Sequence, residues 1–389
     1  MPIGLGTEGV RMAAKMCALV ERLQAIPDPR RQGENLKHQL VDVIILGFCG
    51  VLGGCEDFVE IAEWAKGNEA FFRTFLELPH GIPAHDTFNR VFAMLKPTTL
   101  QEVLLPWLLE RRGLPGDWIH VDGKTLRRTR CEAKQLKALH VVSAWAGQTG
   151  LTLGQVAVEA KSNEITAIPQ LLELLDLHDK VVTIDAIGCQ KEIAQTIVEG
   201  GGDYLLAVKD NQPTLHTEIQ AAFAQEAGAA LTAARRSTSH EKGHGRYEER
   251  TVQVLPAQLA LSTVLLTAWV GVLTVVRVTR VVWCEATGVW STEVSYYLSS
   301  LPPQAQGIGA AIRGHWSVEN GLHWVLDVVF REDARRLYDR TAAENIAFLN
   351  RLALSLLRGD PSKNSLKVKR KRAGWQIPYL AQLLGFPST

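Results

Sequence analysis

The chain has 389 residues, of which 46% are hydrophobic and 21% charged, so it is long enough for two or three domains with apolar cores. This is the composition of an ordinary globular protein. Its 42 Lys and Arg against 41 Asp and Glu give a formal net charge of +1, so the total charge gives no indication of a polyanionic partner.

Positive charge is nevertheless concentrated locally. Arg111–Lys137 holds 8 basic and 3 acidic residues, and Arg331–Arg372 holds 12 basic and 5 acidic residues. Such stretches favour a surface that binds a phosphate backbone, because each neutralised phosphate releases counterions. The alternative for each stretch is a solvated helix face.

The cysteines form no Cys-x-x-Cys pair and no Cys/His array with zinc spacing; they stand at positions 17, 49, 55, 131, 189 and 284. We expect reduced thiols. The first residues, MPIGLGTEGVRMAAK, do not resemble a signal peptide. The expected location is therefore the cytoplasm.

Residues 1–112 are predicted to form an all-α domain, because apolar residues recur at helical spacing between Pro and Gly breaks. The helices are expected over 19–23, 41–52, 58–66, 69–78, 87–95 and 100–110. The segment HDTFNRVFAML is expected to be a short helix capped near Asp86 or Thr87. It could read DNA, but packing within the domain is the preferred interpretation.

Residues 113–360 are predicted to form an α/β domain. Strands are expected in WIHVDG, ALHVVSAWAG, TLGQVAVEA, KVVTIDAIG and DYLLAVKDN, with helices between the later ones, so the sheet should be mixed. A β-rich insertion is expected at about 230–300 and long helices at 304–330 and 341–357. Residues 361–389 are expected to be an exposed basic tail.

One uncharged stretch, Pro256–Val276, approaches the length of a membrane span. It leads into VVRVTRVVW, where valines and arginines nearly alternate. The β-branched residues and the near period of two favour strands in a packed sheet over a membrane segment. No membrane partner is expected.

Two aspartates follow apolar strands. Asp122 closes WIHV and Asp185 closes VVTI. Ligands of open α/β sheets collect at the carboxyl ends of strands, so these carboxylates could share one crevice. A turn or a helix cap is the alternative for each of them. A phosphate-binding loop before Gly123 is excluded, because Trp118 stands where that motif requires glycine.

A third polar group lies in RGHWSVENGLHWVLDVVFRED, where four polar residues follow one another at four-residue steps and should line one helix face: His315, Glu319, His323 and Asp327. A zinc site on this face is conceivable but lacks the His-Glu-x-x-His arrangement. Asp122, Asp185 and Glu319 would instead suit two Mg²⁺ or Mn²⁺ ions, which prefer oxygen ligands. Such an ion pair serves phosphodiester chemistry.

These segments resemble a known family. IHVDGKTLRRT, VVTIDAIGCQKEIAQTIVEGGGDYLLAVKDNQPTL, GHGRYEER and YYLSSLP with RGHWSVENGLHWVLDVVFRED look like bacterial insertion-sequence DDE transposases of the H-repeat-associated type. Similarity continues through TAAENIAFLNRLALSLL, and IPDPRRQGENLKHQLVDVIILGFCGVLGG resembles the family's associated N-terminal domain. Nearly the whole chain is covered.

The resemblance implies a ribonuclease-H-like core with a β-rich insertion, in which Asp122, Asp185 and Glu319 match the metal-binding carboxylates. Related groups also carry a Tyr, an Arg and a Lys on the helix of the glutamate. Here the corresponding residues are Ile312, His315 and Leu326. These departures concern the DNA contacts around Glu319 and leave the metal ligands intact.

The function expected from these motifs is metal-dependent cleavage at the ends of an insertion sequence followed by strand transfer into target DNA. The partner would be double-stranded DNA, bound by a homodimer in the complex. Candidate phosphate contacts are Lys124, Arg127, Arg128, Lys209, His244, Arg246, Arg313 and His315, with the tail Lys367–Arg372 adding non-specific affinity. Trp316 could stack on a flipped base, although a core position is the preferred interpretation.

Two other functions remain open at this stage. A nuclease with the same core would cut DNA without joining it. A non-catalytic DNA-binding relic would keep the motifs after losing activity.

Overall fold

The computed structural model describes residues 19–31, 33, 36–114, 116–159, 162–225, 235–243 and 245–385. Its N-terminal part is helical, as predicted, and the helices are α2 (Leu40–Leu52), α3 (Phe58–Gly67), α4 (Glu69–Phe72), α5 (His85–Met94) and α6 (Pro97–Arg112). Every residue of α2 is buried, which makes this helix the centre of the helical region. In α5, Phe88, Val91 and Phe92 are buried. This supports the packing interpretation of that helix.

A nine-stranded mixed sheet follows, in the order β3-β2-β1-β4-β5-β9-β8-β7-β6. Its first five strands are β1 (Trp118–Leu126), β2 (Leu139–Ala146), β3 (Leu151–Ala157), β4 (Val181–Ile184) and β5 (Asp203–Val208). Strands β1, β2 and β3 pair antiparallel, while β4 and β5 run parallel to β1. This arrangement confirms the expected ribonuclease-H-like core.

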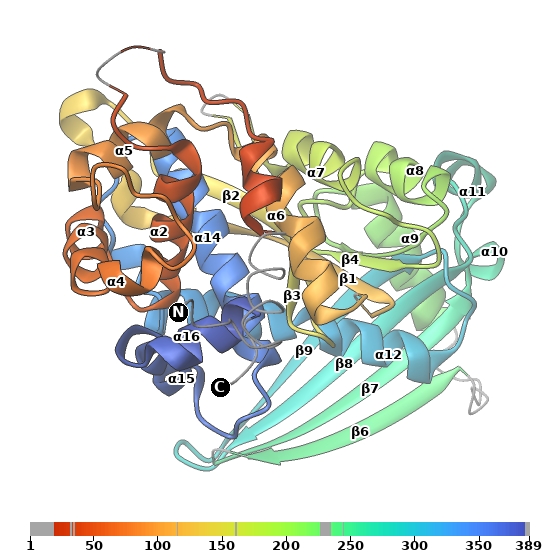
Figure 1. Cartoon of the computed structure of the whole chain (residues 1–389). Coiled ribbons are helices and arrows are strands. Elements are labelled where there is room, and N and C mark those ends of the chain that lie inside the picture. Colours follow the sequence, from red (N-terminus) through yellow and green to blue (C-terminus); the bar gives the residue numbers. More distant parts are fainter. Residues whose placement is uncertain are drawn as a thin grey trace.

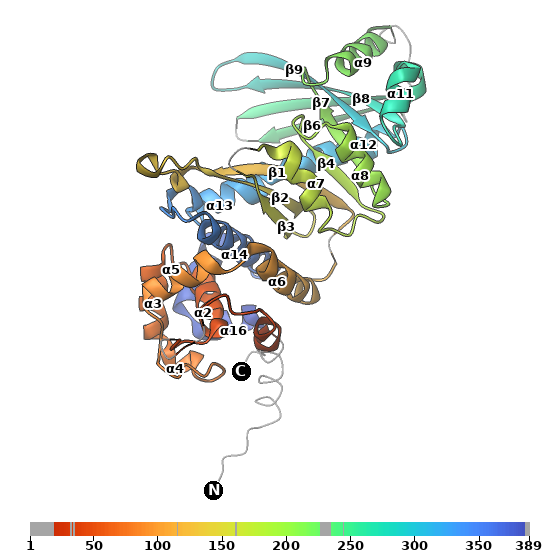
Figure 2. The ribbon, with the colours of Figure 1, turned by 90° about the horizontal axis from the view of Figure 1, so that it is seen from above.

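The β-rich insertion extends the same sheet. Its strands are β6 (Arg236–Gly243), β7 (Arg246–Pro256), β8 (Thr274–Cys284) and β9 (Val289–Ser299), and β9 pairs antiparallel with β5. Figure 2 shows these strands at the opposite end of the molecule from the N-terminal helices. The insertion therefore widens the sheet beyond β5.

The uncharged stretch from Pro256 does not form one long segment. It contains two short helices, α10 (Ala257–Ala260) and α11 (Thr263–Ala268), and then enters β8. Within the part of the chain that the structure describes, no helix has the length and apolar character of a membrane span. The apolar side chains Leu265 and Trp269 are instead buried against the sheet core.

Helices cover both faces of the sheet because alternate strand residues point to opposite sides. On one face lie α7 (Glu164–Leu172), α8 (Lys191–Glu199) and α9 (Pro213–Gln225), which share a core with Val142 and Ala144 of β2. On the other face lie α12 (Ala305–His315) and α14 (Arg340–Gly359), and α14 shares a core with Val141 and Trp145 of β2. Figure 1 shows α14 between the sheet and the N-terminal helices.

The expectation of an exposed basic tail is wrong. Residues beyond 365 form α15 (Leu366–Trp375) and α16 (Ile377–Leu384), whose apolar side chains join the N-terminal helical core. Arg370 is 4% exposed, and its guanidinium donates to the carbonyl oxygens of Val51, Cys55 and Val329. A basic residue can thus serve as a buried donor to backbone oxygens. The number of basic residues in a segment does not reveal this role.

Replacing Arg370 with glutamine is expected to lower the free energy of unfolding by about 2–3 kcal/mol, because it leaves buried carbonyl oxygens without a donor. Its neighbour Lys371 is exposed, so Lys371→Gln is the matched control and should change stability by less than about 0.5 kcal/mol. Urea unfolding followed by circular dichroism measures both. Equal stability of the two variants would show that Arg370 has no such role.

Candidate active site

Asp122 lies in the middle of β1, which corrects the expectation that it ends the strand. The strand continues to Leu126 and remains paired with β2, where Asp122 faces Ser143. Its other neighbour stops earlier, because β4 ends at Ile184, the partner of Val121. Asp122 is therefore the first residue of β1 beyond the parallel pairing, which opens one side of the strand at the carboxylate.

Asp185 directly follows β4, as predicted, and its Oδ1 accepts hydrogen bonds from the backbone N–H groups of Ile187 at 3.1 Å and Gly188 at 3.4 Å. These bonds fix the turn after the strand. Since Asp122 lies next to the end of β4, the ends of two neighbouring strands bring the two aspartates to the same edge of the sheet.

Glu319 lies on a helix that is less regular than predicted. The expected helix over 304–330 is divided into α12, a π-helical turn over Glu319–His323 and α13 (Trp324–Val328). Side-chain ligand atoms of Asp122, Glu319 and His323 all lie within 4.8 Å of one another. Short π-helical turns inside helices are frequent at functional sites.

The predicted polar face of this segment is directed at β1 and β4. His315 Nδ1 lies 2.9 Å from Thr183 Oγ1, and His323 Nδ1 lies 3.6 Å from Asp122 Oδ2. Asp327 forms an ion pair of 2.7 Å with Lys124. The four-residue spacing therefore identified side chains that approach the strands, although the helix between them is not uniform.

The three carboxylates line one cleft of about 480 Å³, together with Lys209, Tyr296 and Trp316. Burial, together with the negative charges of Asp185, Glu164 and Glu319, raises the pKa of Asp122 to about 7. The pKa of Asp185 is also raised, first by burial and then by Glu164. Carboxylates crowded in a cleft with raised pKa values favour a bound cation.

Glu164 is a fourth carboxylate that the sequence analysis missed. It is the first residue of α7, and its Oε1 lies 2.5 Å from His140 Nε2, while His140 Nδ1 lies 2.7 Å from Thr125 Oγ1. A Cβ atom at Gly123 would collide with both Glu164 and His140. In the sequence Glu164 looks only like an acidic residue in the first turn of a helix, so no signal distinguished it.

The residues of the cleft fit a divalent cation. Oxygen atoms of Asp122 and Glu319 lie close together, and Asp185 lines the same space. Hard divalent ions such as Mg²⁺ and Mn²⁺ prefer carboxylate oxygens. A zinc site formed by His315, Glu319 and His323 has less support, because His315 is held by Thr183 and lies outside the close group of donors.

The raised pKa of Asp122 predicts a pH dependence of stability without added metal. Because the pKa of about 7 in the folded state exceeds the ordinary 3.8, stabilisation is complete below pH 3.8 and is lost as the pH rises through about 7. Urea unfolding in EDTA between pH 4 and 7.5 measures this trend, and Asp122→Asn should remove most of it. An unchanged trend in the variant would contradict the assignment.

The candidate phosphate contacts fall into two groups, those that are buried or already paired and those that are exposed. Lys124 is 7% exposed and is paired with Asp327 and Asp333 at 2.7 and 3.2 Å. The expectation that Lys124 contacts phosphate is therefore wrong. Arg313 is half-exposed and paired with Glu241. His315 is engaged by Thr183, and His244 lies outside the described residues. The exposed candidates are Arg127, Arg128, Lys209 and Arg246.

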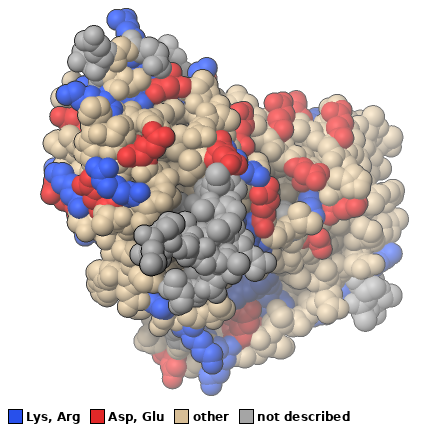
Figure 3. Space-filling model, in the orientation of Figure 1, with Lys and Arg blue, Asp and Glu red and all other residues tan. Residues whose placement is uncertain are grey.

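One face of the molecule shows no single basic track. On the face seen in Figure 3, Lys and Arg side chains are scattered among acidic ones, and acidic side chains gather on the side of α7 and α8. This agrees with the near-zero net charge.

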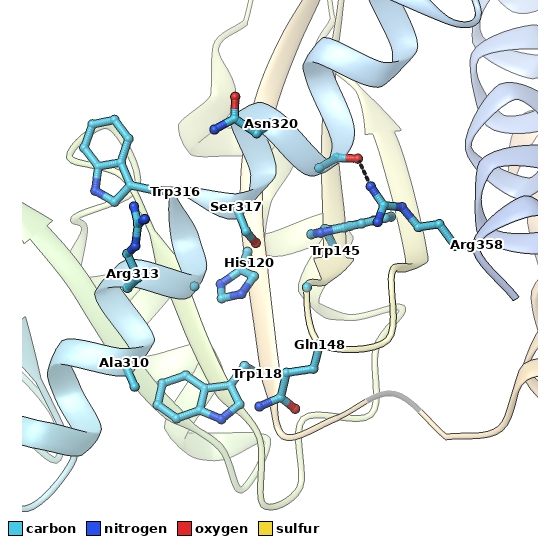
Figure 4. A pocket seen from close by; sticks show the side chains of 13 residues that line it. Trp118, His120, Trp145, Gln148, Ala310, Arg313, Trp316, Ser317, Asn320 and Arg358 are labelled. Carbon is cyan, nitrogen blue, oxygen red and sulfur yellow. Dashed lines mark hydrogen bonds between the residues drawn. The ribbon is translucent and has the colours of Figure 1, made fainter. Parts of the chain in front are cut away.

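A second cavity of about 740 Å³ lies beside the cleft and shares Trp316 with it. Figure 4 shows Trp118, His120 and Arg313 around this space, and Arg358 donating to the Gly321 carbonyl oxygen at 2.6 Å. Trp316 is 51% exposed, so the interpretation of this residue as part of the core is wrong. Its indole is available at the border of both spaces.

Comparison with known proteins agrees with this geometry. Residues 115–356 match the family described as the transposase DDE domain, and residues 20–108 match the DDE_Tnp_1-associated family. The chain belongs to the DDE transposase family. The region matched to the transposase DDE domain includes Asp122, Asp185 and Glu319.

Its relatives in this family include bacterial proteins of nearly the same length. The chain is 36% identical over 373 residues to "Putative transposase YncI" of Escherichia coli O157:H7, covering 94% of each chain. It is also 36% identical to "H repeat-associated putative transposase YhhI" of Escherichia coli K12, covering 94% of this chain and 97% of that one. The piggyBac transposase synaptic complex with hairpin DNA aligns with a TM-score of 0.41 and 12% identity, over 97% and 80% of the two chains.

This DDE transposase departs from related groups at three positions on the helix of Glu319, and the structure shows the surroundings of each. Ile312 and Leu326 are 2% and 0% exposed and pack in the apolar core, while His315 bonds to Thr183. None of these three positions therefore offers a free polar group to a DNA backbone. Cations on other elements, such as Lys209 after β5, are better placed in the cleft.

Proposed function

We propose that this chain cuts DNA at the ends of an insertion sequence and joins the freed ends to target DNA. The observation that carries the proposal is the meeting of Asp122, Asp185 and Glu319 in one cleft, from segments far apart in the sequence. Membership in the DDE transposase family supports the reaction class. The expected site of action is the bacterial cytoplasm, at the nucleoid.

Asp122, Asp185 and Glu319 would hold two Mg²⁺ or Mn²⁺ ions. When bound, such ions would stabilise the negative charge on the attacking and leaving oxygens of a phosphodiester. Glu164 and His140 pack beside Gly123 and orient the backbone next to Asp122. Burial of Asp122 keeps its carboxylate out of bulk water, which strengthens its attraction for a cation.

The proposed reaction has two balanced displacements. In the first, a water oxygen bonds to phosphorus while the bond from phosphorus to the 3′ oxygen breaks; one water proton ends on the 3′ hydroxyl and the other in solvent. In the second, this hydroxyl oxygen bonds to a target phosphorus, the target's 3′ oxygen leaves, and a proton passes from one hydroxyl to the other. Neither displacement requires a covalent bond to the protein.

DNA would be held by cations around the cleft. Lys209 lines the cleft, and Arg127, Arg128 and Arg246 are exposed. Arg313 could exchange its partner Glu241 for a phosphate. Each phosphate contact would add affinity without sequence preference. A homodimer bound to two element ends is the assembly proposed for strand transfer.

The proposal is tested by incubating the full chain with Mg²⁺, duplexes carrying the element ends and a target plasmid. Products in which the end is joined to the plasmid are expected. Cleaved ends without joined products would favour a nuclease, and binding without cleavage in either Mg²⁺ or Mn²⁺ would favour a non-catalytic relic. Either result would overturn the proposed transposition.

A further inference from the structure

The close donor group around Asp122 and Glu319 contains a histidine, His323, that the three-carboxylate description leaves out. Glu319 and His323 are the first and last residues of the π-helical turn. In an α-helix, residues four apart lie on the same side but are offset by about 40°, since one turn takes 3.6 residues. Both side chains reach Asp122 from this turn, and ligand atoms of the three residues lie within 4.8 Å of one another.

The environment of His323 fits a metal ligand. Its side chain is 12% exposed, and Nδ1 lies 3.6 Å from Asp122 Oδ2, beyond the range of a hydrogen bond. Adjacent ligands around an octahedral ion with bonds of about 2.1 Å are about 3 Å apart, so the observed separation is near that value. The other ring nitrogen, Nε2, is buried and has no hydrogen-bond partner among the described residues.

The histidines that line the cleft, His216 and His315, have hydrogen-bond partners. His315 Nδ1 lies 2.9 Å from Thr183 Oγ1, and His216 Nδ1 lies 3.1 Å from Asp210 Oδ1. His323 differs from them because its Nδ1 lies 3.6 Å from the carboxylate of Asp122, beyond hydrogen-bond range.

We propose that His323 supplies a nitrogen ligand to the ion held by Asp122 and Glu319, making this position favour Mn²⁺ over Mg²⁺. Mg²⁺ strongly prefers oxygen, whereas imidazole suits transition-metal ions. The ion nearer Asp185 would keep ligands of oxygen alone. This inference rests on the proposed metal-dependent function. It specifies the ligands and the preferred ion at one of the two proposed metal positions.

Pulsed electron paramagnetic resonance of the full chain with Mn²⁺ tests the assignment, because a directly bound imidazole gives ¹⁴N modulation. Wild type is expected to show this signal and His323→Gln to lose it. Calorimetric titration should show Mn²⁺ affinity falling about tenfold or more in His323→Gln, with a smaller change for Mg²⁺. His315→Gln is the matched control from the same cleft and should keep both the signal and the affinity.

The outcomes separate this inference from the proposed function. Mn²⁺ binding that depends on Asp122 but shows no ¹⁴N modulation, or modulation that persists in His323→Gln, would overturn the role of His323 alone. Absence of Mn²⁺ and Mg²⁺ binding to folded wild type would overturn both. Thermal melting of each variant identifies any loss of binding caused by unfolding, and His323→Asn provides a second variant if His323→Gln does not fold.

Discussion

Asp122→Asn is expected to lower the rate of Mg²⁺-dependent cleavage of element-end DNA by at least about a thousandfold, which corresponds to roughly 4 kcal/mol. Asparagine keeps the size of the side chain but removes the charge at the centre of the donor group. The loss should appear in the chemical step, because a metal ion stabilises the charge that develops as the phosphodiester breaks. Asp185→Asn and Glu319→Gln should have effects of similar size.

Single-turnover cleavage of a labelled duplex measures these rates, and an electrophoretic mobility shift measures DNA binding, which should remain within about threefold of wild type. Asp210→Asn is the matched control: its side chain lines the same cleft but is fully exposed. It should retain cleavage within a few-fold of wild type. Full activity in any of the three carboxylate variants would remove that residue from the mechanism.

Arg351→Met is expected to destabilise the fold by about 3–5 kcal/mol, because it leaves a buried carboxylate without its cation. Arg351 and Glu332 have side chains that are 0% and 2% exposed, and their ion pair is 3.1 Å long. Arg351 Nε also donates to Ser143 Oγ, which lies opposite Asp122 in the sheet. The substitution should therefore loosen the pairing of β2 with the strand that carries Asp122.

Urea unfolding gives the size of this effect. The double variant Arg351→Met with Glu332→Leu removes both charges and should be more stable than Arg351→Met alone, since apolar residues can replace a buried ion pair at little cost. A loss below about 1 kcal/mol for Arg351→Met would show that the pair is dispensable. A double variant less stable than the single one would contradict the charge-burial explanation.

The helices, strands and residue placements that were predicted correctly are those marked by a pattern within a few neighbouring residues. Alternating helix and strand patterns identified the mixed sheet, and the apolar run VVTI placed Asp185 at a strand end. The four-residue spacing from His315 to Asp327 identified the side chains that approach β1 and β4. Each of these features depends on neighbours within a few residues, which a single sequence records.

The features that were missed depend on distant partners. Glu164 meets His140 across a strand and a helix, and Lys124 is neutralised by Asp327 and Asp333 more than 200 positions away. Asp122 was placed at a strand end because it follows the apolar run WIHV, whereas pairing with β2 carries the strand onward. Basic residues such as Arg370 were assigned to solvent because charge alone does not reveal a buried carbonyl partner.

Helix α14 has a consequence for how the protein can be divided. It packs against α2, α5 and α6 on one side and against β2 and β3 on the other, and nearly all its residues from Ala342 to Leu357 are buried. A fragment that ends at residue 112 would lack α14, which covers its apolar core. A fragment that begins at residue 113 would expose the apolar face of α14 to water. The helical region and the sheet therefore share one core through α14, and we expect them to unfold together.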